Sequence, residues 1–250
     1  MPAASPLRTA AAAVTFLTKV PLGARMPVDA PDVARGSVLF PLVGGAIGAV
    51  VGLVAVGLDI VVPALVAAAL AVATEAVITG AIHLDALADA ADGLGGGTPE
   101  RALEIMRDPR LGAFGAVGLA LDLILKTAAV AALLDHERTV LVLLAAWSVG
   151  RAAPLALAAV LPSARETPGT AGVLSGTAST ARLTLGVVIG IAIAAAAGER
   201  ALGLLAASAL CLLVVAVTAR ARFRGVTGDV LGAAVELTTT FALVGATASL

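Results

Sequence analysis

Residues 79–115 read TGAIHLDALADAADGLGGGTPERALEIMRDPRLGAFG and separate two long apolar runs. On a helix, offsets of four and three place Asp85, Asp89 and Asp92 within about 60° of one another, so that three carboxylates share one face. Carboxylates this close repel unless a cation binds them, and Mg²⁺ is the hard divalent ion that prefers oxygen ligands beside phosphate. The stretch therefore predicts a Mg²⁺ site with these three aspartates as ligands. A solvated acidic turn is the alternative interpretation.

A glycine-rich segment follows the third aspartate. Gly95, Gly96 and Gly97 would let backbone N–H groups approach a phosphate closely, so we expect them to bind substrate. Thr98 is a candidate helix N-cap with proline at the next position, and predicts a helix that extends to about Arg107. Arginines suited to phosphate oxygens lie in or just after this helix: Arg101, Arg107 and Arg110. Carboxylates, glycines and arginines in this order indicate metal-assisted chemistry on a phosphate ester or anhydride.

The composition is that of an integral membrane protein. Of the 250 residues, 60% are hydrophobic and 13% are charged, whereas soluble domains are nearer one quarter charged. Residues 1–250 are interpreted as one membrane domain, an all-α helix bundle with about seven spans in the lipid bilayer. The expected spans cover residues 38–58, 62–82, 111–134, 139–161, 183–197, 201–219 and 230–249. The net charge of −1 gives no reason to expect a nucleic-acid partner, and the single cysteine excludes a disulfide within the chain.

The distribution of lysine and arginine predicts the orientation. Outside the spans, Arg138 and Arg200 are the only two on one side, and all the others fall on the opposite side. That richer side comprises residues 1–37, 83–110, 162–182 and 220–229. The positive-inside rule therefore predicts a cytoplasmic N-terminus, and a cytoplasmic catalytic loop at 83–110. Within residues 1–37, the short apolar run is interpreted as an interfacial amphipathic helix.

Three glycines in the first span are spaced by four residues. Gly44, Gly48 and Gly52 predict a seam along which another helix can approach closely, with chance occurrence in a glycine-rich chain as the alternative. Small, glycine-rich spans also favour self-association, so a homo-oligomer is possible.

Several ionisable residues fall inside the expected spans, where each needs a partner or a function. Asp122 and Lys126 are four apart in the order that favours an ion pair within one helix. Arg151 either balances an acid such as Glu75 or contacts a substrate phosphate. His83 lies at the end of the second span and is either a buried interfacial histidine or a ligand or proton carrier.

The start of the last span has the features of a second phosphate-binding site. Thr227, Gly228 and Asp229 lie where a helix would begin, and a glycine-rich helix N-terminus binds anions. Asp229 supplies either a further metal ligand or an N-cap. Residues 165–172, RETPGTAG, combine Arg165 with an acid and glycines, so three polar segments are expected to converge over one bundle.

The acidic stretch resembles the signature of the cobalamin synthase family, membrane enzymes also called adenosylcobinamide-GDP ribazoletransferases. The resemblance extends to residues 40–48, 165–172 and 227–233, and thus covers nearly the whole chain. It departs from the family pattern at Ala86 and Arg224, where glycine or another small residue is usual. The resemblance implies transfer of the cobinamide-phosphate group of adenosylcobinamide-GDP to α-ribazole or its 5′-phosphate, with release of GMP. It also implies dependence on Mg²⁺, a place in the bacterial inner membrane and an active site on the cytoplasmic side.

On this reading the three aspartates hold Mg²⁺ against the diphosphate. Candidates for the phosphate clamp are Arg107, Arg110 and Arg165, and candidates for the general base are Asp108, Glu104 and His83. His83 would point away from the aspartates on an uninterrupted helix, so its role requires a break in the helix before Asp85.

Three other classes of membrane protein share some of these features. A CDP-alcohol phosphotransferase performs similar chemistry, but its motif with an Ala-Arg pair is not found here. A prenyltransferase would need a second aspartate-rich motif. A small ion-coupled transporter would explain the charges inside the spans, but it predicts its key acids at mid-membrane rather than in a loop.

Overall fold

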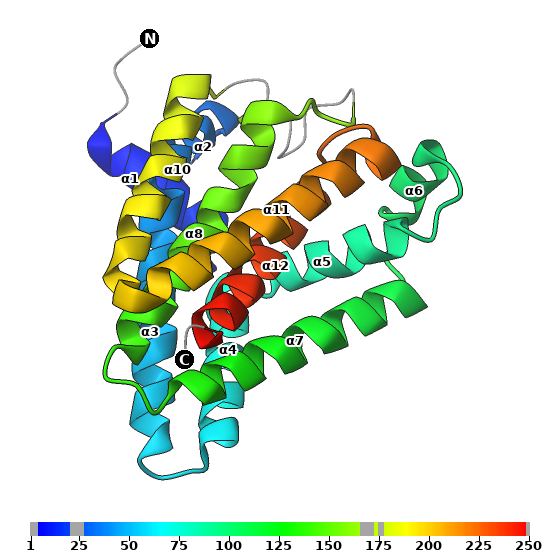
Figure 1. Cartoon of the computed structure of the whole chain (residues 1–250). Coiled ribbons are helices and arrows are strands. Elements are labelled where there is room, and N and C mark those ends of the chain that lie inside the picture. Colours follow the sequence, from blue (N-terminus) through cyan, green and yellow to red (C-terminus); the bar gives the residue numbers. More distant parts are fainter. Residues whose placement is uncertain (1–4, 21–27, 166–172, 175–177, 249–250) are drawn as a thin grey trace.

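The computed structural model describes residues 5–20, 28–165, 173–174 and 178–248 of the chain, and within these it is all-α, as expected (Figure 1). The helices are α1 (Pro6–Leu17), α2 (Ala30–Gly36), η1 (Ser37–Leu39), α3 (Phe40–Asp59), α4 (Ala64–Thr79), α5 (Ile82–Gly93), α6 (Pro99–Ile105), α7 (Ala113–Leu133), α8 (Thr139–Val160), α10 (Thr180–Ala194), η2 (Ala195–Arg200), α11 (Ala201–Phe223) and α12 (Gly228–Thr247). In Figure 1, α3, α8 and α10 stand upright, whereas α5, α7 and α11 run at a steep angle to them.

Five helical segments in the described ranges are long and apolar enough to cross a membrane, or six if α4 and α5 count as one bent span. The chain is thus a multi-pass membrane protein, but the expected count of about seven spans is not confirmed. One reason is that α10, η2 and α11 form a continuous helical segment of 44 residues, 180–223, where we expected two spans. Gly198 interrupts this segment with a φ of 63°. The side of the membrane on which the N-terminus lies stays a prediction.

The second expected span ends earlier than the sequence suggested. Helix α4 stops at Thr79, and α5 starts at Ile82 in a direction that differs by 93°. Gly80 and Ala81 between them both have left-handed backbone angles, with φ of 64° and 56°. This conformation is natural for glycine but strained for alanine, so a break at Ala81 is not expected from the residue type.

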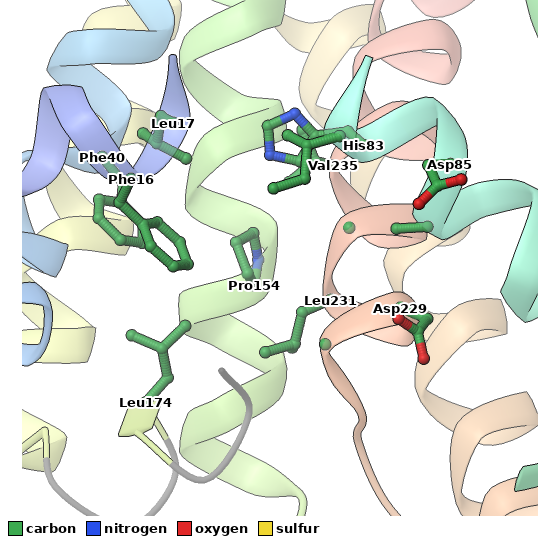
Figure 2. A pocket seen from close by; sticks show the side chains of 14 residues that line it. Phe16, Leu17, Phe40, His83, Asp85, Pro154, Leu174, Asp229, Leu231 and Val235 are labelled. Atoms are coloured by element: carbon green, nitrogen blue, oxygen red, sulfur yellow. The ribbon is translucent and has the colours of Figure 1, made fainter. Parts of the chain in front are cut away.

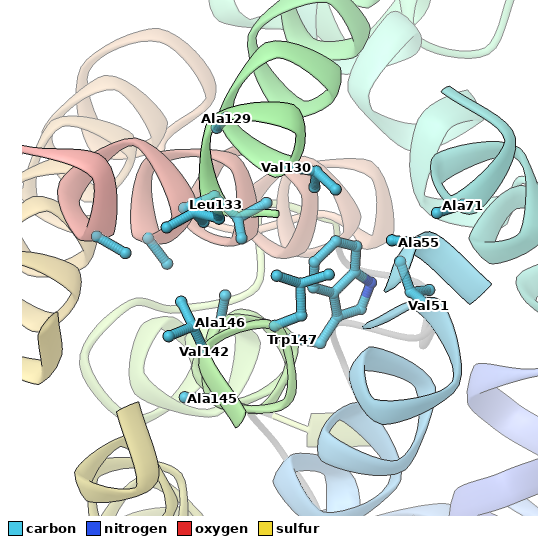
Figure 3. Packing of buried hydrophobic residues seen from close by; sticks show 14 of the residues in the cluster. Val51, Ala55, Ala71, Ala129, Val130, Leu133, Val142, Ala145, Ala146 and Trp147 are labelled. Atoms are coloured by element: carbon cyan, nitrogen blue, oxygen red, sulfur yellow. The ribbon is translucent and has the colours of Figure 1, made fainter. Parts of the chain in front are cut away.

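The glycine seam predicted in α3 is confirmed, and it receives α8. A Cβ atom on Gly44 or Gly48 would lie 2.4 Å from a backbone carbonyl oxygen of α8, that of Trp147 or Leu143 respectively. The close approach of the two helices buries Trp147 completely among small side chains such as Ala55 and Ala71 (Figure 3). Because α8 already occupies this seam, the seam provides no support for a homo-oligomer.

The charges inside the bundle pair with one another. Lys126 Nζ lies 3.2 Å from Asp122 and 3.5 Å from Glu75, and it also contacts Glu236. Arg151 Nη2 lies 2.9 Å from Glu75. The predicted pair Asp122–Lys126 is therefore confirmed, and of the alternatives for Arg151 the structure favours charge balance over contact with substrate.

Candidate active site

Helices α5 and α12 lie against each other, and together they carry the carboxylates of the candidate site. Ala86 of α5 packs on Gly232 of α12 so closely that a Cβ on Gly232 would lie 2.4 Å from the Cβ of Ala86. The first turn of α12 is held by Thr227, whose side chain is the N-cap and accepts a hydrogen bond from the backbone N–H of Val230. Thr227, rather than Asp229, thus caps the helix, and the carboxylate of Asp229 remains free for other contacts.

A cavity of about 720 Å³, including the part open to solvent, lies between α5, α12 and the N-terminal helices. Asp85 and Asp229 line one end of it, from α5 and from the start of α12 (Figure 2). Asp89 lies one turn after Asp85 on α5, where the charges of Asp85 and Asp229 act on it. The cavity thus has a strongly acidic end built from two helices that are far apart in the sequence.

The one described cation beside this acidic end is Arg165. Its Nη2 atom lies 3.1 Å from the Oδ2 atom of Asp229. The backbone supports this contact, because residues 162–164 pair with the segment before α12, where Ala164 N donates to Val226 O and Val226 N donates to Pro162 O. The expected meeting of the segment that begins at Arg165 with the entry of the last span is therefore observed at Arg165 itself. Residues 166–172 lie outside the described part of the chain.

The three aspartates predicted to bind metal fall into two groups. Within the described residues, the carboxylates of Asp85 and Asp89 have no hydrogen-bond or ion-pair partner. Asp92 is different, because its two oxygens accept hydrogen bonds from the backbone N–H groups of Gly112 at 2.7 Å and Gly115 at 2.8 Å. Asp92 therefore holds the N-terminus of α7, where an anion is favoured.

The oxygen donors that fit a hard cation are those of Asp85, Asp89 and Asp229. No three His, Cys, Asp or Glu side chains in the described ranges are already gathered as a metal site. Oxygen donors of this kind would suit Mg²⁺, with Asp229 beside Asp85 and Asp89 while Asp92 holds α7; Mg²⁺ binding and its ligands stay a prediction.

The residues predicted on and after α6 are not brought to the cavity. Thr98 caps α6 as expected, but the helix ends at Ile105. Acids and arginines here are exposed and bind one another: Arg101 contacts Glu104 at 2.6 Å, and Arg110 contacts Asp108 at 2.6 Å. The hydrogen bonds from Arg110 lower the pKa of Asp108 to about 2, which makes this carboxylate a weak base. Glu104, Arg107, Asp108 and Arg110 do not line the cavity that holds Asp85 and Asp229.

The glycine-rich segment also makes contacts of its own. The N–H groups of Gly95 and Gly96 donate to the carbonyls of Asp92 and Gly93, so they are not free to bind a phosphate in this conformation. Arg222 of α11 donates to the carbonyl oxygens of Leu94 and Gly96, at 2.7 and 2.8 Å. The described contacts of this turn are structural, joining α5 to α6 and α11, and substrate binding by Gly95, Gly96 and Gly97 stays a prediction.

His83 does line the cavity, although not as expected. The helix break precedes His83 as well as Asp85, so both residues lie on α5 two positions apart. The imidazole is 7% exposed, and its Nδ1 atom is buried without a hydrogen-bond partner among the described residues. The apolar part of the lining, which includes Phe16 and Phe40, was missed in the sequence, where the only available signal was phenylalanine in a chain with 2% aromatic residues.

The family model and the individual relatives that match this chain indicate the same family. The model of the family described as cobalamin-5-phosphate synthase matches residues 9–247. A protein of Pseudomonas paraeruginosa named adenosylcobinamide-GDP ribazoletransferase is 40% identical over 242 residues, covering 95% of this chain and 97% of its own. A protein of the same name from Azorhizobium caulinodans is 37% identical and covers 90% of both chains. No solved structure matches. This chain therefore belongs to the cobalamin-5-phosphate synthase family.

Proposed function

We propose that this chain is an adenosylcobinamide-GDP ribazoletransferase. It transfers the cobinamide-phosphate group of adenosylcobinamide-GDP to α-ribazole or its 5′-phosphate, and releases GMP. The proposal is supported by the family and by relatives of that name that cover almost the whole chain. The observation that carries it is the acidic end of the cavity, where Asp85 and Asp229 are part of the lining. The charges of both act on Asp89, and Arg165 pairs with Asp229.

The reaction requires groups that bind phosphate oxygens and neutralise their charge, and this end of the cavity has candidates for both roles. A ribose hydroxyl attacks the β-phosphorus of the GDP-linked alcohol and loses its proton to a carboxylate at this end of the cavity. The bond from that phosphorus to the bridging oxygen breaks, and GMP leaves with the electron pair. Arg165 is the described side chain that can donate to phosphate oxygens here, provided that it exchanges Asp229 for the substrate. The N-terminus of α12, which begins at Gly228, is a helix end that favours an anion. Mg²⁺ bound by Asp85, Asp89 and Asp229 would neutralise charge on the diphosphate.

The proposed location is the inner membrane of a bacterium, with the acidic end of the cavity open to the cytoplasm. The distribution of arginines outside the spans supports this orientation. It can be tested by labelling a cysteine introduced at the exposed Glu104 in intact cells and in inverted vesicles. We expect labelling by an impermeant reagent in inverted vesicles only, and labelling in intact cells would reverse the orientation.

The activity is tested by incubating detergent-solubilised protein with adenosylcobinamide-GDP, α-ribazole and a series of Mg²⁺ concentrations. We expect GMP release that requires both substrates and saturates with Mg²⁺. Asp85→Asn should lower turnover by about 100-fold or more, whereas Asp135→Asn, a matched change at an exposed acid of a connecting turn, should leave it unchanged.

Two other results would each overturn the proposal. Release of CMP from a CDP-alcohol, without GMP release, would favour a CDP-alcohol phosphotransferase. Uptake of a solute into vesicles without GMP release would favour a transporter that uses the buried charges around Lys126.

A further inference from the structure

The cavity beside Asp85 and Asp229 has two ends of opposite character. Figure 2 shows the two carboxylates on one side, and Phe16, Phe40 and Leu174 on the other. The apolar end is built by α1, by the start of α3, and by α8 and α12. Buried residues from all four of these helices form one hydrophobic cluster. The cavity therefore extends from the proposed site of phosphoryl transfer into an apolar interior.

Aromatic side chains are rare in this chain, and two of them meet in this cavity. The sequence has five phenylalanines, one tryptophan and no tyrosine. Phe16 and Phe40 lie with ring centroids 5.4 Å apart and an angle of 8° between their planes. Such a stacked pair offers a flat apolar surface to a planar ligand.

Among the described residues, the apolar part of the lining has one polar side chain. Apart from Asp85 and Asp229, the described lining contains no polar residue except His83, and neither lysine nor arginine. The imidazole of His83 is more than nine-tenths buried, and its Nδ1 atom lacks a hydrogen-bond partner in the described part of the chain. A buried imidazole gains free energy from a hydrogen-bond partner, so a ligand in the cavity that accepts a hydrogen bond from this ring is favoured.

These features distinguish between the two substrates of the proposed reaction. The diphosphate and guanine of adenosylcobinamide-GDP need cations and several hydrogen-bonding groups, and the described residues of the apolar end do not supply them. The corrin ring with its amide side chains is larger than this cavity, whose volume of about 720 Å³ includes the part open to solvent. The base of α-ribazole, a dimethylated benzimidazole, is flat, apolar and uncharged, and it has one unsubstituted ring nitrogen that can accept one hydrogen bond.

We propose that the apolar end of this cavity binds the benzimidazole of α-ribazole, with the imidazole N–H of His83 donating a hydrogen bond to the free ring nitrogen of the base. This inference rests on the proposed function. Its consequence is that the ribose of the bound nucleoside extends toward Asp85 and Asp229, where its hydroxyl meets the phosphorus. His83 is then a specificity-determining residue for the nucleoside, rather than the general base.

The first test measures KM separately for the two substrates in purified protein. His83→Ala should raise the KM for α-ribazole about tenfold, the value of one hydrogen bond to a neutral group. The KM for adenosylcobinamide-GDP should change less than twofold. His83→Gln, whose longer amide can also donate a hydrogen bond into the cavity, should recover most of the loss.

The second test changes the ligand and leaves the protein intact, so it does not depend on the folding of a variant. An α-riboside of dimethylindole has a carbon in place of the free ring nitrogen. Wild-type protein should use it with a KM about ten times that of α-ribazole, and His83→Ala should use the two with similar KM values. Equal KM values in the wild type would overturn the role of His83.

A third comparison tests the location. Leu231→Trp fills the cavity and should raise the KM for α-ribazole by more than tenfold, whereas Leu202→Trp, at a leucine that is 79% exposed on α11, should not. If Leu231→Trp instead raises the KM for adenosylcobinamide-GDP alone, the cavity binds the other substrate and this inference fails while the proposed function stands. Absence of GMP release from the wild type would remove the proposed function itself.

Discussion

Asp92→Asn tests whether the acidic motif divides into catalytic and structural members. The carboxylate of Asp92 accepts two backbone hydrogen bonds at the start of α7, from Gly112 and Gly115. Asparagine keeps one acceptor oxygen but presents an amide N–H₂ to the other backbone N–H. One charge-assisted hydrogen bond is therefore lost, at about 2 kcal/mol, and for a chain of this length the melting temperature should fall by about 4 to 8 °C.

Asp85→Asn should behave in the opposite way. Asp85 has no described partner, and its charge acts unfavourably on Asp89, so its neutralisation should leave the melting temperature unchanged or raise it. Turnover should nevertheless fall by about 100-fold or more. The assay is thermal unfolding of each variant in one detergent, followed by GMP release at a temperature at which every variant is folded, with Asp135→Asn as the control.

The reasoning is refuted by a specific combination of results. If Asp92→Asn melts within 1 °C of the wild type and loses GMP release as completely as Asp85→Asn, Asp92 belongs to the catalytic carboxylates. Substrate or metal would then break the hydrogen bonds that Asp92 accepts from α7.

Three further outcomes are expected. Gly48→Ala should lower the free energy of unfolding by about 1 to 3 kcal/mol, because its Cβ would lie 2.4 Å from a carbonyl oxygen of α8. Gly57→Ala, whose Cβ would have no atom within 4 Å, should raise the free energy of unfolding slightly. Equal shifts of the melting temperature in the two variants would contradict the close packing of α3 on α8. Lys126→Met should cost about 3 to 5 kcal/mol by leaving buried carboxylates without their cation; Lys126→Met with Glu236→Gln should melt higher than Lys126→Met alone. Because Arg110 holds the pKa of Asp108 at about 2, Asp108 stays ionised above about pH 4, so Asp108→Asn should leave the acidic limb of the pH–turnover profile unchanged between pH 5 and 8; a shifted limb would place Asp108 in the reaction.

Much of the fold could be predicted because local patterns determine it. The four-residue spacing of glycines in α3, the cap at Thr98, and the pair Asp122–Lys126 all depend on residues within one or two turns of each other, and the structure has each of them. The break between α4 and α5 was less accessible, because it places Ala81 in a left-handed conformation that alanine rarely adopts.

The site was only partly predictable, because its composition depends on which helices meet. Asp85, Asp89 and Asp92 form one pattern in the sequence, but α7 approaches the end of α5 and occupies Asp92. The signal for this was present in Gly112 and Gly115, where any Cβ would fall within 2.5 Å of an Asp92 oxygen. Arginines and acids of α6 were adjacent in sequence to the motif, yet only the start of α5 lines the cavity. Helix α6 follows the opposite end of α5, as Figure 1 shows.

The central claim is that carboxylates from α5 and α12 act together on one phosphoryl transfer. A double-mutant cycle on GMP release tests it, with Asp85→Asn, Asp229→Asn and the two combined, in protein shown to be folded. We expect each single change to lower turnover by about 100-fold or more and the combination to lower it little further, because groups that act as a unit are not additive. Turnover near that of the wild type in either single variant, or losses that multiply in the double variant, would contradict the claim.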